Sequence, residues 1–379
     1  MNPFTEKQHE ELRQRIRNFA ESEIAPEAEK LDSEERFSPE LTRKMGQEGI
    51  LGINIPKKYG GRELDTLSYI IAVEELARVD SSQAATVAAH NSLGLVPILD
   101  YGTDTQKEKY LPKLTTGEHL WAFGLTEENA GSDARGTETT AIIEGEEWVI
   151  NGSKRYITNI SNPLTLGVTL QVMTQNGDQP SQLTTILVEK GTPGFESQRL
   201  LGKMMWRASD TGKASFTNCR VPLENLLGQE GQGARYMLKT LDGGRLSVAA
   251  MGLGLAQGAF EMAAKHAKTR KQFGKPINRY QAIAFKLADM DMKLELARNT
   301  LYKACWLKDN NQPYTREAAM AKLYTSEIAR EIADEAVQVF GGSGLFKDNP
   351  IERFYRDQRL LQIGEGTSEI LRLVIARGI

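Results

Sequence analysis

The sequence is poor in cysteine and histidine, and it holds no long hydrophobic run. Two cysteines, Cys219 and Cys305, and four histidines occur in 379 residues. The cysteines lie too far apart to form a metal clip, and one disulfide is a weak framework for a chain of this length. We therefore expect two buried, reduced thiols. The histidines show no HExxH spacing, so the main sequence signal of a zinc hydrolase is absent, and no other metal site is expected.

Neither sign of charge dominates. The 47 Lys and Arg residues against 50 Asp and Glu residues give a net charge of −3, which excludes a global positive field for nucleic acid or anionic lipid. No apolar run approaches the roughly 18 to 20 residues that a membrane span needs. The N-terminus also lacks the basic and then apolar pattern of a signal peptide and is too acidic for a transit peptide. We expect a cytoplasmic or already processed protein with no nucleic-acid partner and no membrane span.

The common nucleotide-binding and hydrolase motifs are missing as well. No G-x-G-x-x-G follows a strand, and neither G-x-x-x-x-G-K-[ST] nor G-x-S-x-G occurs. These absences argue against classical Rossmann, P-loop and α/β-hydrolase chemistry.

Hydrophobic periodicity divides the chain into three regions. Residues 1–120 read as an α-helical domain, because apolar residues recur at spacings of three and four. Residues 121–228 read as a β domain of antiparallel strands, with turns expected at Asn151-Gly152, Asn176-Gly177 and Pro193-Gly194. Residues 229–379 return to the helical period. The fold class is therefore α+β, mostly α.

The strongest helical signal is a heptad seam in the third region. Its members are Ile283, Leu287, Met290, Leu294, Ala297, Leu301 and Ala304. A second helix is expected over Ala318 to Phe340, where Gly341-Gly342-Ser343-Gly344 stops it. Such a seam is typical of an antiparallel helical bundle.

Three polar clusters could carry chemistry. They are WAFGLTEENAGSD (121–133), NGSKRYITN (151–159) and QIGEGTSE (362–369). Each has a structural explanation: a capped turn, a hairpin, and a helix N-terminus capped by Thr367 or Ser368. In the second cluster, Tyr156 and Thr158 share one face of a strand. Capping does not explain Glu365, since a glycine on each side exposes its carboxylate and lets a ligand approach.

Taken in order, these clusters and three further segments resemble the acyl-CoA dehydrogenase family. Within the family, the sequence is most similar to the short-chain, butyryl-CoA-type members. The segments that carry the resemblance over nearly the whole chain are LTEENAGSD (125–133), NGSKRYITN (151–159), RKQFGKPINRYQAI (270–283), QVFGGSGL (338–345), RFYRDQRLLQIGEGTSEI (353–370) and RLVIAR (372–377). The resemblance implies a helical N-terminal domain, a central antiparallel β domain and a C-terminal four-helix bundle. It also implies a homotetramer built as a dimer of dimers, with one non-covalent FAD per subunit and electron-transferring flavoprotein as acceptor.

The resemblance also assigns roles to residues. It implies that the residues in contact with the flavin are Phe123, Leu125, Thr126, Gly131, Ser132, Tyr156 and Thr158. It implies that the residues in contact with the FAD pyrophosphate and adenosine are Arg270, Phe273, Gln338, Gly341, Gly342, Thr367 and Glu369. Arg270 and Phe273 would reach the FAD of the partner subunit. Along the acyl-CoA it implies Ser132, Asp242, Arg245, Gly364 and Gly366.

Glu365 matches the family's catalytic base. In the family this carboxylate removes the α-proton while the β-hydrogen leaves as hydride to flavin N5, giving the trans-2-enoyl thioester. The backbone N–H of the glutamate and the ribityl 2′-hydroxyl polarise the thioester carbonyl. Burial should raise the pKa of Glu365 toward about 6 to 7. Some family members carry the base at the position of Gly244, which has no carboxylate here.

Two positions depart from the family pattern. Gly364 replaces a frequent Tyr before the base, which opens space and predicts a branched, cyclic, bulky or longer acyl group in place of plain butyryl. The loop Asn159-Ile160-Ser161-Asn162-Pro163 replaces Asn-Gly-Gly and changes the surroundings of the flavin edge. Three alternatives stay open at this point: an acyl-carrier-protein-linked dehydrogenase, a flavin oxidase or monooxygenase on the same fold, and a catalytically inactive scaffold.

Overall fold

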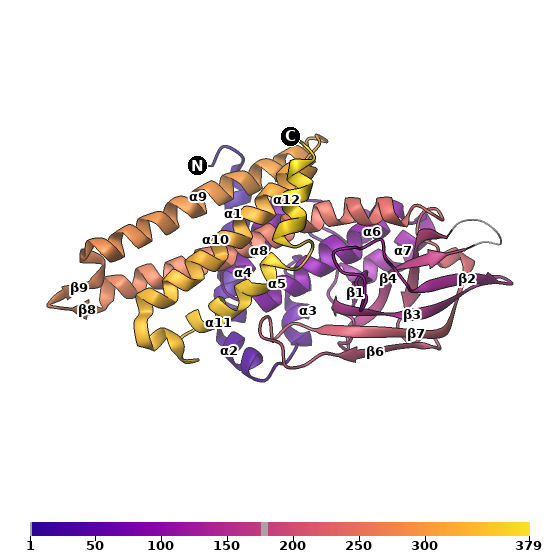
Figure 1. Cartoon of the computed structure of the whole chain (residues 1–379), viewed down its shortest axis with the longest axis horizontal. Coiled ribbons are helices and arrows are strands. Elements are labelled where there is room, and N and C mark those ends of the chain that lie inside the picture. The colour runs from indigo at the N-terminus through magenta and orange to yellow at the C-terminus, as the bar shows by residue number, and fades with distance from the viewer. Residues whose placement is uncertain (1, 176–180) are drawn as a thin grey trace.

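The elements follow one another as helices, then strands, then helices again (Figure 1). The computed structural model describes residues 2–175 and 181–379. The first stretch contains α1 (Lys7–Phe19), η1 (Ala20–Ile24), α2 (Ala25–Ser33), α3 (Pro39–Gln47), η2 (Lys57–Tyr59), α4 (Thr66–Ala77), α5 (Ser81–Ala88), η3 (Ala89–Leu95), α6 (Val96–Tyr101) and α7 (Asp104–Leu114). Side-chain caps begin several of these helices, with Ser38, Asp65, Asp80 and Thr103 accepting from the backbone N–H three residues on.

The middle stretch forms one seven-stranded sheet. Its strands are β1 (Leu120–Gly124), β2 (Thr140–Glu144), β3 (Glu147–Thr158), β4 (Thr165–Thr174), β5 (Gln182–Glu189), β6 (Phe195–Arg199) and β7 (Thr211–Pro222), followed by η4 (Leu223–Asn225). Most neighbours pair antiparallel, whereas β4 runs parallel to both β1 and β2. The sheet is therefore mixed at that edge, a detail that local turn signals cannot give.

The predicted turns have different outcomes. Pro193-Gly194 does connect β5 to β6, and Asn176-Gly177 falls outside the described residues. The turn at Asn151-Gly152 is wrong: both residues lie inside β3, where the pairing with β7 shifts register and Gly152 adopts φ +140°. A glycine in a strand can mark a bulge as well as a turn. The hairpin between β2 and β3 turns instead at Gly145, with φ +65°.

The last stretch is helical and carries the long bundle. It contains α8 (Gly233–Thr269), β8 (Lys271–Gln272), β9 (Lys275–Pro276), η5 (Ile277–Arg279), α9 (Gln281–Asp309), α10 (Thr315–Phe340), η6 (Gly341–Leu345), α11 (Ile351–Asp357), η7 (Gln358–Gln362) and α12 (Ser368–Ala376). The heptad seam is confirmed, since five of its members on α9 are buried and Ile283 and Leu287 pack partly buried against the same core. The second helix ends at Phe340, as predicted.

Helix α8 ties the two helical stretches together. It contacts α4, α9 and α10, and an added Cβ on its Gly254 would lie 2.1 Å from the Glu74 carbonyl oxygen of α4. By length and composition α8 could cross a membrane, but 78% of its most apolar window is buried inside the protein, as in a core helix. One apolar core is therefore shared by the N-terminal and C-terminal helices, and the sheet has a second core of its own.

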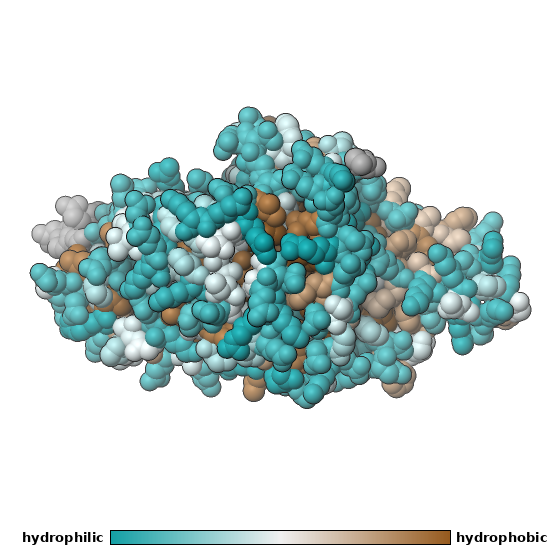
Figure 2. Space-filling model, turned by 180° about the vertical axis from the view of Figure 1, so that it is seen from behind, coloured by the Kyte–Doolittle hydropathy of each residue, from teal (hydrophilic) through white to brown (hydrophobic). Residues whose placement is uncertain are grey.

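The surface seen from behind is largely hydrophilic, with apolar patches gathered toward the end that carries the bundle (Figure 2). Helix α9 contributes to the exposed apolar surface, because Phe285, Met292 and Leu296 are all more than half exposed. Both cysteines are free and buried, as the sequence predicted.

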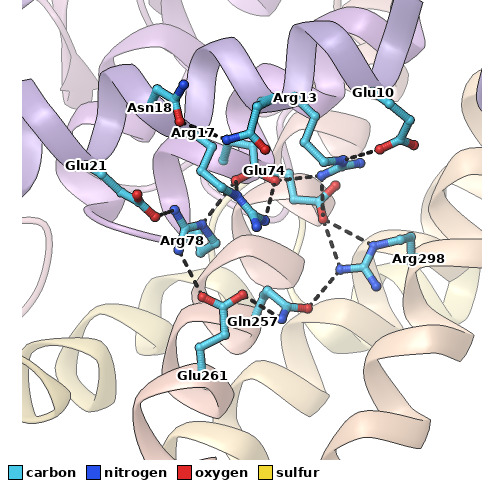
Figure 3. A network of polar contacts seen from close by, with 12 residues as sticks. Glu10, Arg13, Arg17, Asn18, Glu21, Glu74, Arg78, Gln257, Glu261 and Arg298 are labelled. Carbon is cyan, nitrogen blue, oxygen red and sulfur yellow. Dashed lines mark hydrogen bonds and ion pairs between the residues drawn. The ribbon is translucent and has the colours of Figure 1, made fainter. Parts of the chain in front are cut away.

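A buried network of charges joins α1, α4, α8 and α9 (Figure 3). On α4, Glu75 accepts hydrogen bonds from Arg13 at 2.7 Å and from Arg17 at 2.9 Å. Its neighbour Glu74 pairs with Arg298 at 3.1 Å and accepts the Tyr302 hydroxyl at 2.6 Å. Burial alone would raise the pKa of Glu74, yet the arginines hold it well below its usual range. The network fixes the first helices of the chain against the C-terminal bundle.

Candidate active site

Glu365 lies in a left-handed turn between η7 and α12. Its φ of +54° is uncommon for a residue other than glycine, and Gly366 continues the turn with φ +104°. The chain then enters α12, where the Thr367 hydroxyl accepts from the Ile370 N–H at 3.3 Å, which confirms the predicted N-cap. Strained backbone of this kind persists where the surroundings determine it, often at functional sites.

The Glu365 carboxylate projects toward α8, and one of its two oxygens accepts no hydrogen bond. Although the residue as a whole is partly exposed, its Oε2 atom is buried without a partner. A Cβ added to Gly244 of α8 would lie 2.0 Å from that oxygen and 3.2 Å from Leu93 Cδ2. The missing side chain at Gly244 therefore provides the space that the carboxylate occupies.

The electrostatics of this position suit a base that works near neutral pH. Burial raises the pKa of Glu365 to about 7, against the lowering effect of Lys322 and Arg245. A base is most effective when its pKa lies near the working pH. The backbone N–H of Glu365 also donates to no acceptor among the described residues, so one residue offers both a free carboxylate oxygen and a free hydrogen-bond donor.

Two cations flank the turn from different helices. Lys322 of α10 is completely buried and donates from Nζ to the Gly366 carbonyl oxygen at 2.6 Å. Arg245 of α8 donates to Asp242 at 2.6 Å, and the other Asp242 oxygen accepts the Thr315 hydroxyl at 2.6 Å. An added Cβ on Gly366 would lie 3.9 Å from Arg245 Nη2. The structure thus brings Asp242, Arg245, Gly364, Glu365 and Gly366 together.

The segment before the turn is anchored to α10. The Ser326 hydroxyl donates to the Leu361 carbonyl at 2.9 Å, and Gln362 Nε2 donates back to the Ser326 carbonyl at 2.7 Å. After the turn, the Ser368 hydroxyl donates to Glu327 at 2.6 Å. These bonds on both sides explain how the strained turn keeps its shape.

A second group of predicted residues meets where β1 ends beside β3. The Arg155 N–H donates to the Thr126 carbonyl at 2.8 Å, and buried Lys154 reaches the Leu125 carbonyl at 3.1 Å. On β3, Ile157 is buried, Tyr156 is exposed and Thr158 is partly exposed, and the pairing with β7 shifts register between Lys154 and Ile157. The Tyr156 ring is 63% exposed on a backbone of φ +55°. Phe123 lies on β1, and Gly131 and Ser132 lie in the exposed segment that follows it.

The loop that departs from the family pattern is firmly held. Asp210 accepts hydrogen bonds from the Ser161 N–H at 2.7 Å and the Asn162 N–H at 3.0 Å. Asn159 is buried and donates to the Thr86 carbonyl of α5 at 3.0 Å. The altered residues therefore form an ordered connection between the sheet and the first helices.

The third group lies at the far end of the bundle. Arg270 caps the C-terminus of α8, and Phe273 lies in the β8–β9 hairpin that follows it and projects at the left of Figure 1. The stacking of His266 on Phe340, with ring centroids 4.3 Å apart, brings the end of α8 to the end of α10, where Gln338, Gly341 and Gly342 lie exposed. Along α8, Gly244 and Arg270 are about 40 Å apart. A single chain does not bring this group to Glu365, whereas Thr367 and Glu369 adjoin it.

These groups have the character of a dinucleotide site. Phe273 is 95% exposed on a backbone of φ +50°, next to Arg270, and guanidinium groups suit phosphates. An added Cβ on Gly131, Gly341 or Gly342 would meet nothing within 4 Å, which leaves their backbone open to close approach. Exposed Tyr156 offers an aromatic face beside Thr158. The residues present therefore fit a bound flavin nucleotide.

The sequence reasoning missed two lysines. Lys154, within the second polar cluster, is buried and pairs with Glu127 at 2.6 Å beneath the Leu125–Thr126 turn. Lys322 occupies a core-facing position of α10, in line with buried Ala318, Thr325 and Ala329. A lysine in an apolar helical stripe is a signal that sequence alone could have raised.

Comparison with known proteins gives one consistent result. Three family models match the chain: acyl-CoA dehydrogenase N-terminal domain over residues 6–118, middle domain over 122–219 and C-terminal domain over 231–379. "Probable acyl-CoA dehydrogenase YngJ" of Bacillus subtilis is 47% identical and matches 100% of this chain and 99% of its own length. The short-chain-specific acyl-CoA dehydrogenase of Clostridium acetobutylicum is 45% identical over 98% and 97%. The structure of butyryl-CoA dehydrogenase from Megasphaera elsdenii superposes with a TM-score of 0.95, at 40% identity over 99% and 98%.

Proposed function

Since this chain belongs to the acyl-CoA dehydrogenase family and is an FAD-dependent enzyme of acyl-CoA dehydrogenation, we propose that Glu365 is its catalytic base. The observation that carries this assignment is a buried carboxylate oxygen without a partner, on a residue whose pKa is raised to about 7. Gly244 leaves no rival carboxylate at the alternative position on α8.

The proposed mechanism uses two groups of the same residue. The Glu365 carboxylate takes the α-proton of the acyl thioester, and the Glu365 N–H, which has no other acceptor among the described residues, donates to the thioester carbonyl. Such a donor typically contributes roughly a hundred- to a thousandfold in rate. When bound, the oxidised flavin supplies the acceptor for the β-hydrogen as hydride. Arg245 and Asp242, next to the turn, would orient the pantetheine part of the substrate.

We propose that two subunits build each FAD site. Phe123, Leu125, Thr126, Gly131, Ser132, Tyr156 and Thr158 would hold the flavin end, and Gln338, Gly341, Gly342, Thr367 and Glu369 the adenosine side. Arg270, Phe273, Gln338, Gly341 and Gly342 would come from the partner, because they lie together at the far end of the bundle, and Arg270 is about 40 Å along α8 from Gly244. The exposed apolar residues of α9 support a homotetramer in which this helix is covered.

The acyl pocket is proposed to accept a branched, cyclic or otherwise bulky chain. At Gly364 an added Cβ would meet Leu360 at 3.6 Å, an ordinary contact, and the residue has no positive φ. The fold therefore does not require glycine there, which supports a role for the empty space itself. We further propose electron-transferring flavoprotein as acceptor, and a cytoplasmic location that agrees with two free, buried cysteines.

The base assignment is tested by anaerobic bleaching of the purified yellow protein with a panel of acyl-CoA thioesters. The wild type should bleach with one class of substrate, and Glu365→Gln should bind the same thioester without bleaching. Glu335→Gln, which removes a partly exposed carboxylate of α10 that pairs with Lys286 of α9, is the matched control and should bleach normally. Wild-type bleaching rates in Glu365→Gln would overturn the assignment.

The proposed acyl preference has its own test. kcat/KM is compared for butyryl-, isobutyryl-, 2-methylbutyryl- and cyclic acyl-CoA in the wild type and in Gly364→Tyr. We expect the wild type to favour the bulkier groups and the variant to lose that preference. A clear butyryl optimum in the wild type contradicts the proposal.

A further inference from the structure

Lys154 and Lys322 are the two buried lysines among the described residues, and their surroundings differ. Lys154 forms an ion pair with Glu127 at 2.6 Å. Lys203, which is partly exposed, donates to several oxygens, including the Trp206 and Ser209 carbonyls at 2.7 and 2.8 Å. Lys322 is completely buried, but its ammonium donates to a single acceptor among the described residues, the Gly366 carbonyl at 2.6 Å, and no carboxylate lies within 4.0 Å of it. A buried cation without an ion pair carries a desolvation cost that packing does not repay.

The position of this cation relates it to Glu365. Its one acceptor belongs to the residue that follows the candidate base, so the hydrogen bond fixes the left-handed Glu365–Gly366 turn directly. Glu365 Oε2 has no partner either. The carboxylate and the ammonium therefore flank the same turn without forming a contact ion pair, and the carboxylate stays free to accept a proton.

We infer that Lys322 is a positioning residue for the reaction, which holds the turn through the Gly366 carbonyl and supplies a nearby positive charge that favours ionised Glu365. This inference rests on the proposed role of Glu365. The charged and titratable groups around the pair come from four helices: Tyr69 on α4, Arg245 on α8, Glu327 on α10 and Glu369 on α12. Of these, Arg245 is the only other cation that acts on Glu365, and it is already paired with Asp242.

The protonation states agree with this role. Burial lowers the pKa of Lys322 to about 8, against the raising effect of Glu365. Lys322 therefore remains mostly protonated at the pH at which Glu365, with its pKa of about 7, gives up its proton. Removing the positive charge should raise the pKa of Glu365, because the charged carboxylate loses its strongest favourable neighbour.

Two substitutions separate the charge from the hydrogen bond. Lys322→Gln keeps a donor and removes the charge, whereas Lys322→Met removes both. Anaerobic flavin reduction by a saturating acyl-CoA is followed in holoenzyme across the pH range that spans both pKa values. In a plot of the rate of flavin reduction against pH, we expect the acidic limb of both variants to shift to higher pH by about one unit. This shift lowers the rate at pH 7 about fivefold. The alkaline plateau should fall in Lys322→Met alone.

Matched variants complete the design. Lys322→Arg should restore the position of the limb, because it restores the charge. Ser326→Ala removes two neutral hydrogen bonds one turn along the same helix, to the Lys322 carbonyl at 2.6 Å and the Leu361 carbonyl at 2.9 Å, but no charge, and it should leave the acidic limb unmoved. An unchanged limb in flavin-loaded Lys322→Gln would refute the inference, even if every rate fell, since a merely structural role lowers the plateau alone. If Lys322→Met does not fold, Lys322→Gln and Lys322→Arg still decide the question.

The two proposals fail in different ways. If Glu365→Gln reduces flavin at the wild-type rate, the base assignment fails, whatever Lys322 does. If Glu365→Gln is inactive while the limb of Lys322→Gln coincides with that of the wild type, only the role of Lys322 is refuted.

Discussion

Gly244→Ala should lower kcat about a hundredfold while the fold is kept. The added methyl carbon would lie 2.0 Å from Glu365 Oε2, and real Cβ atoms essentially never approach closer than 3.0 Å. The carboxylate must therefore withdraw by about 1 Å or more. This movement is cheap for folding, because the atom in the way is the free end of a side chain. For catalysis, a misplacement of about 1 Å can cost on the order of a hundredfold.

A neighbouring glycine provides the control. Gly243 lies in the same turn of α8, and an added Cβ there would meet only Lys308 Nζ, at 3.7 Å. Both substitutions replace glycine by alanine inside a helix and should gain up to about 1 kcal/mol in helix propensity. Gly243→Ala should therefore keep its rate, and Gly244→Ala should keep its Tm but lose about a hundredfold in kcat.

The assay is single-turnover flavin reduction under anaerobic conditions, with Tm and flavin content measured on the same samples. Equal rates for Gly243→Ala and Gly244→Ala would refute the reasoning, because they would show that the carboxylate does not work from the place it occupies beside α8. A large drop in Tm for Gly244→Ala would show that the added methyl group destabilises the folded protein instead of displacing only the carboxylate.

Three further predictions follow from burial and charge. Burial raises the pKa of Glu365 from 4.5 to about 7, so the folded state keeps a proton that the unfolded state has lost, and the carboxyl group costs stability as pH rises from about 4.5 to 7. In denaturant unfolding, Glu365→Gln should be more stable than the wild type by up to about 3 kcal/mol at pH 8 and equally stable near pH 4. A stability advantage that does not depend on pH would contradict this. Glu74→Ala leaves Arg298 without its buried carboxylate partner and the Tyr302 hydroxyl without its acceptor, and it should cost about 3 to 5 kcal/mol in the free energy of unfolding. Glu10→Ala, at the exposed edge of the same network, should cost under about 0.5 kcal/mol, and similar losses for the two variants would contradict this reasoning. Phe273→Ala should weaken FAD retention in gel filtration without lowering the Tm of the apoprotein, since the ring is 95% exposed, and unchanged retention would argue against the partner-subunit contact.

The helices were predictable because their signals are local. The seam from Ile283 to Ala304 repeats every three and four residues, and a long repeat of this kind has no competing β interpretation. A cap at Thr367 or Ser368 could be predicted because a hydroxyl before an apolar helix commonly caps it, and the structure has Thr367 as the cap. In each case the prediction depended on residues within a few turns of one another.

The sheet was less predictable, since pairing depends on residues far apart in the chain. Asn151-Gly152 has the composition of a hairpin turn, but β3 continues through it, because β7 pairs with β3 on both sides of the bulge. The parallel pairing of β1 with β4 similarly joins residues 45 or 46 positions apart, with β2 and β3 between them and no direct turn to indicate the pairing. Turn propensity reflects only the local sequence, whereas the formation of a bulge depends on how the strand pairs with its neighbour.

The active-site turn shows the same limit at the level of single side chains. Two flanking glycines drew attention to Glu365, but nothing in its neighbourhood along the chain tells that its carboxylate ends where a side chain of Gly244 would begin. Gly244 on α8 has no side chain, and the Glu365 carboxylate fills the space this leaves, although the two residues are 121 positions apart in the sequence. Lys322 of α10 adds a third residue to this arrangement. A substitution at any of these three positions should therefore alter the effect of a substitution at the others, and double variants of Gly244 and Lys322 should depart from additivity in kcat, as expected for residues that act on one group.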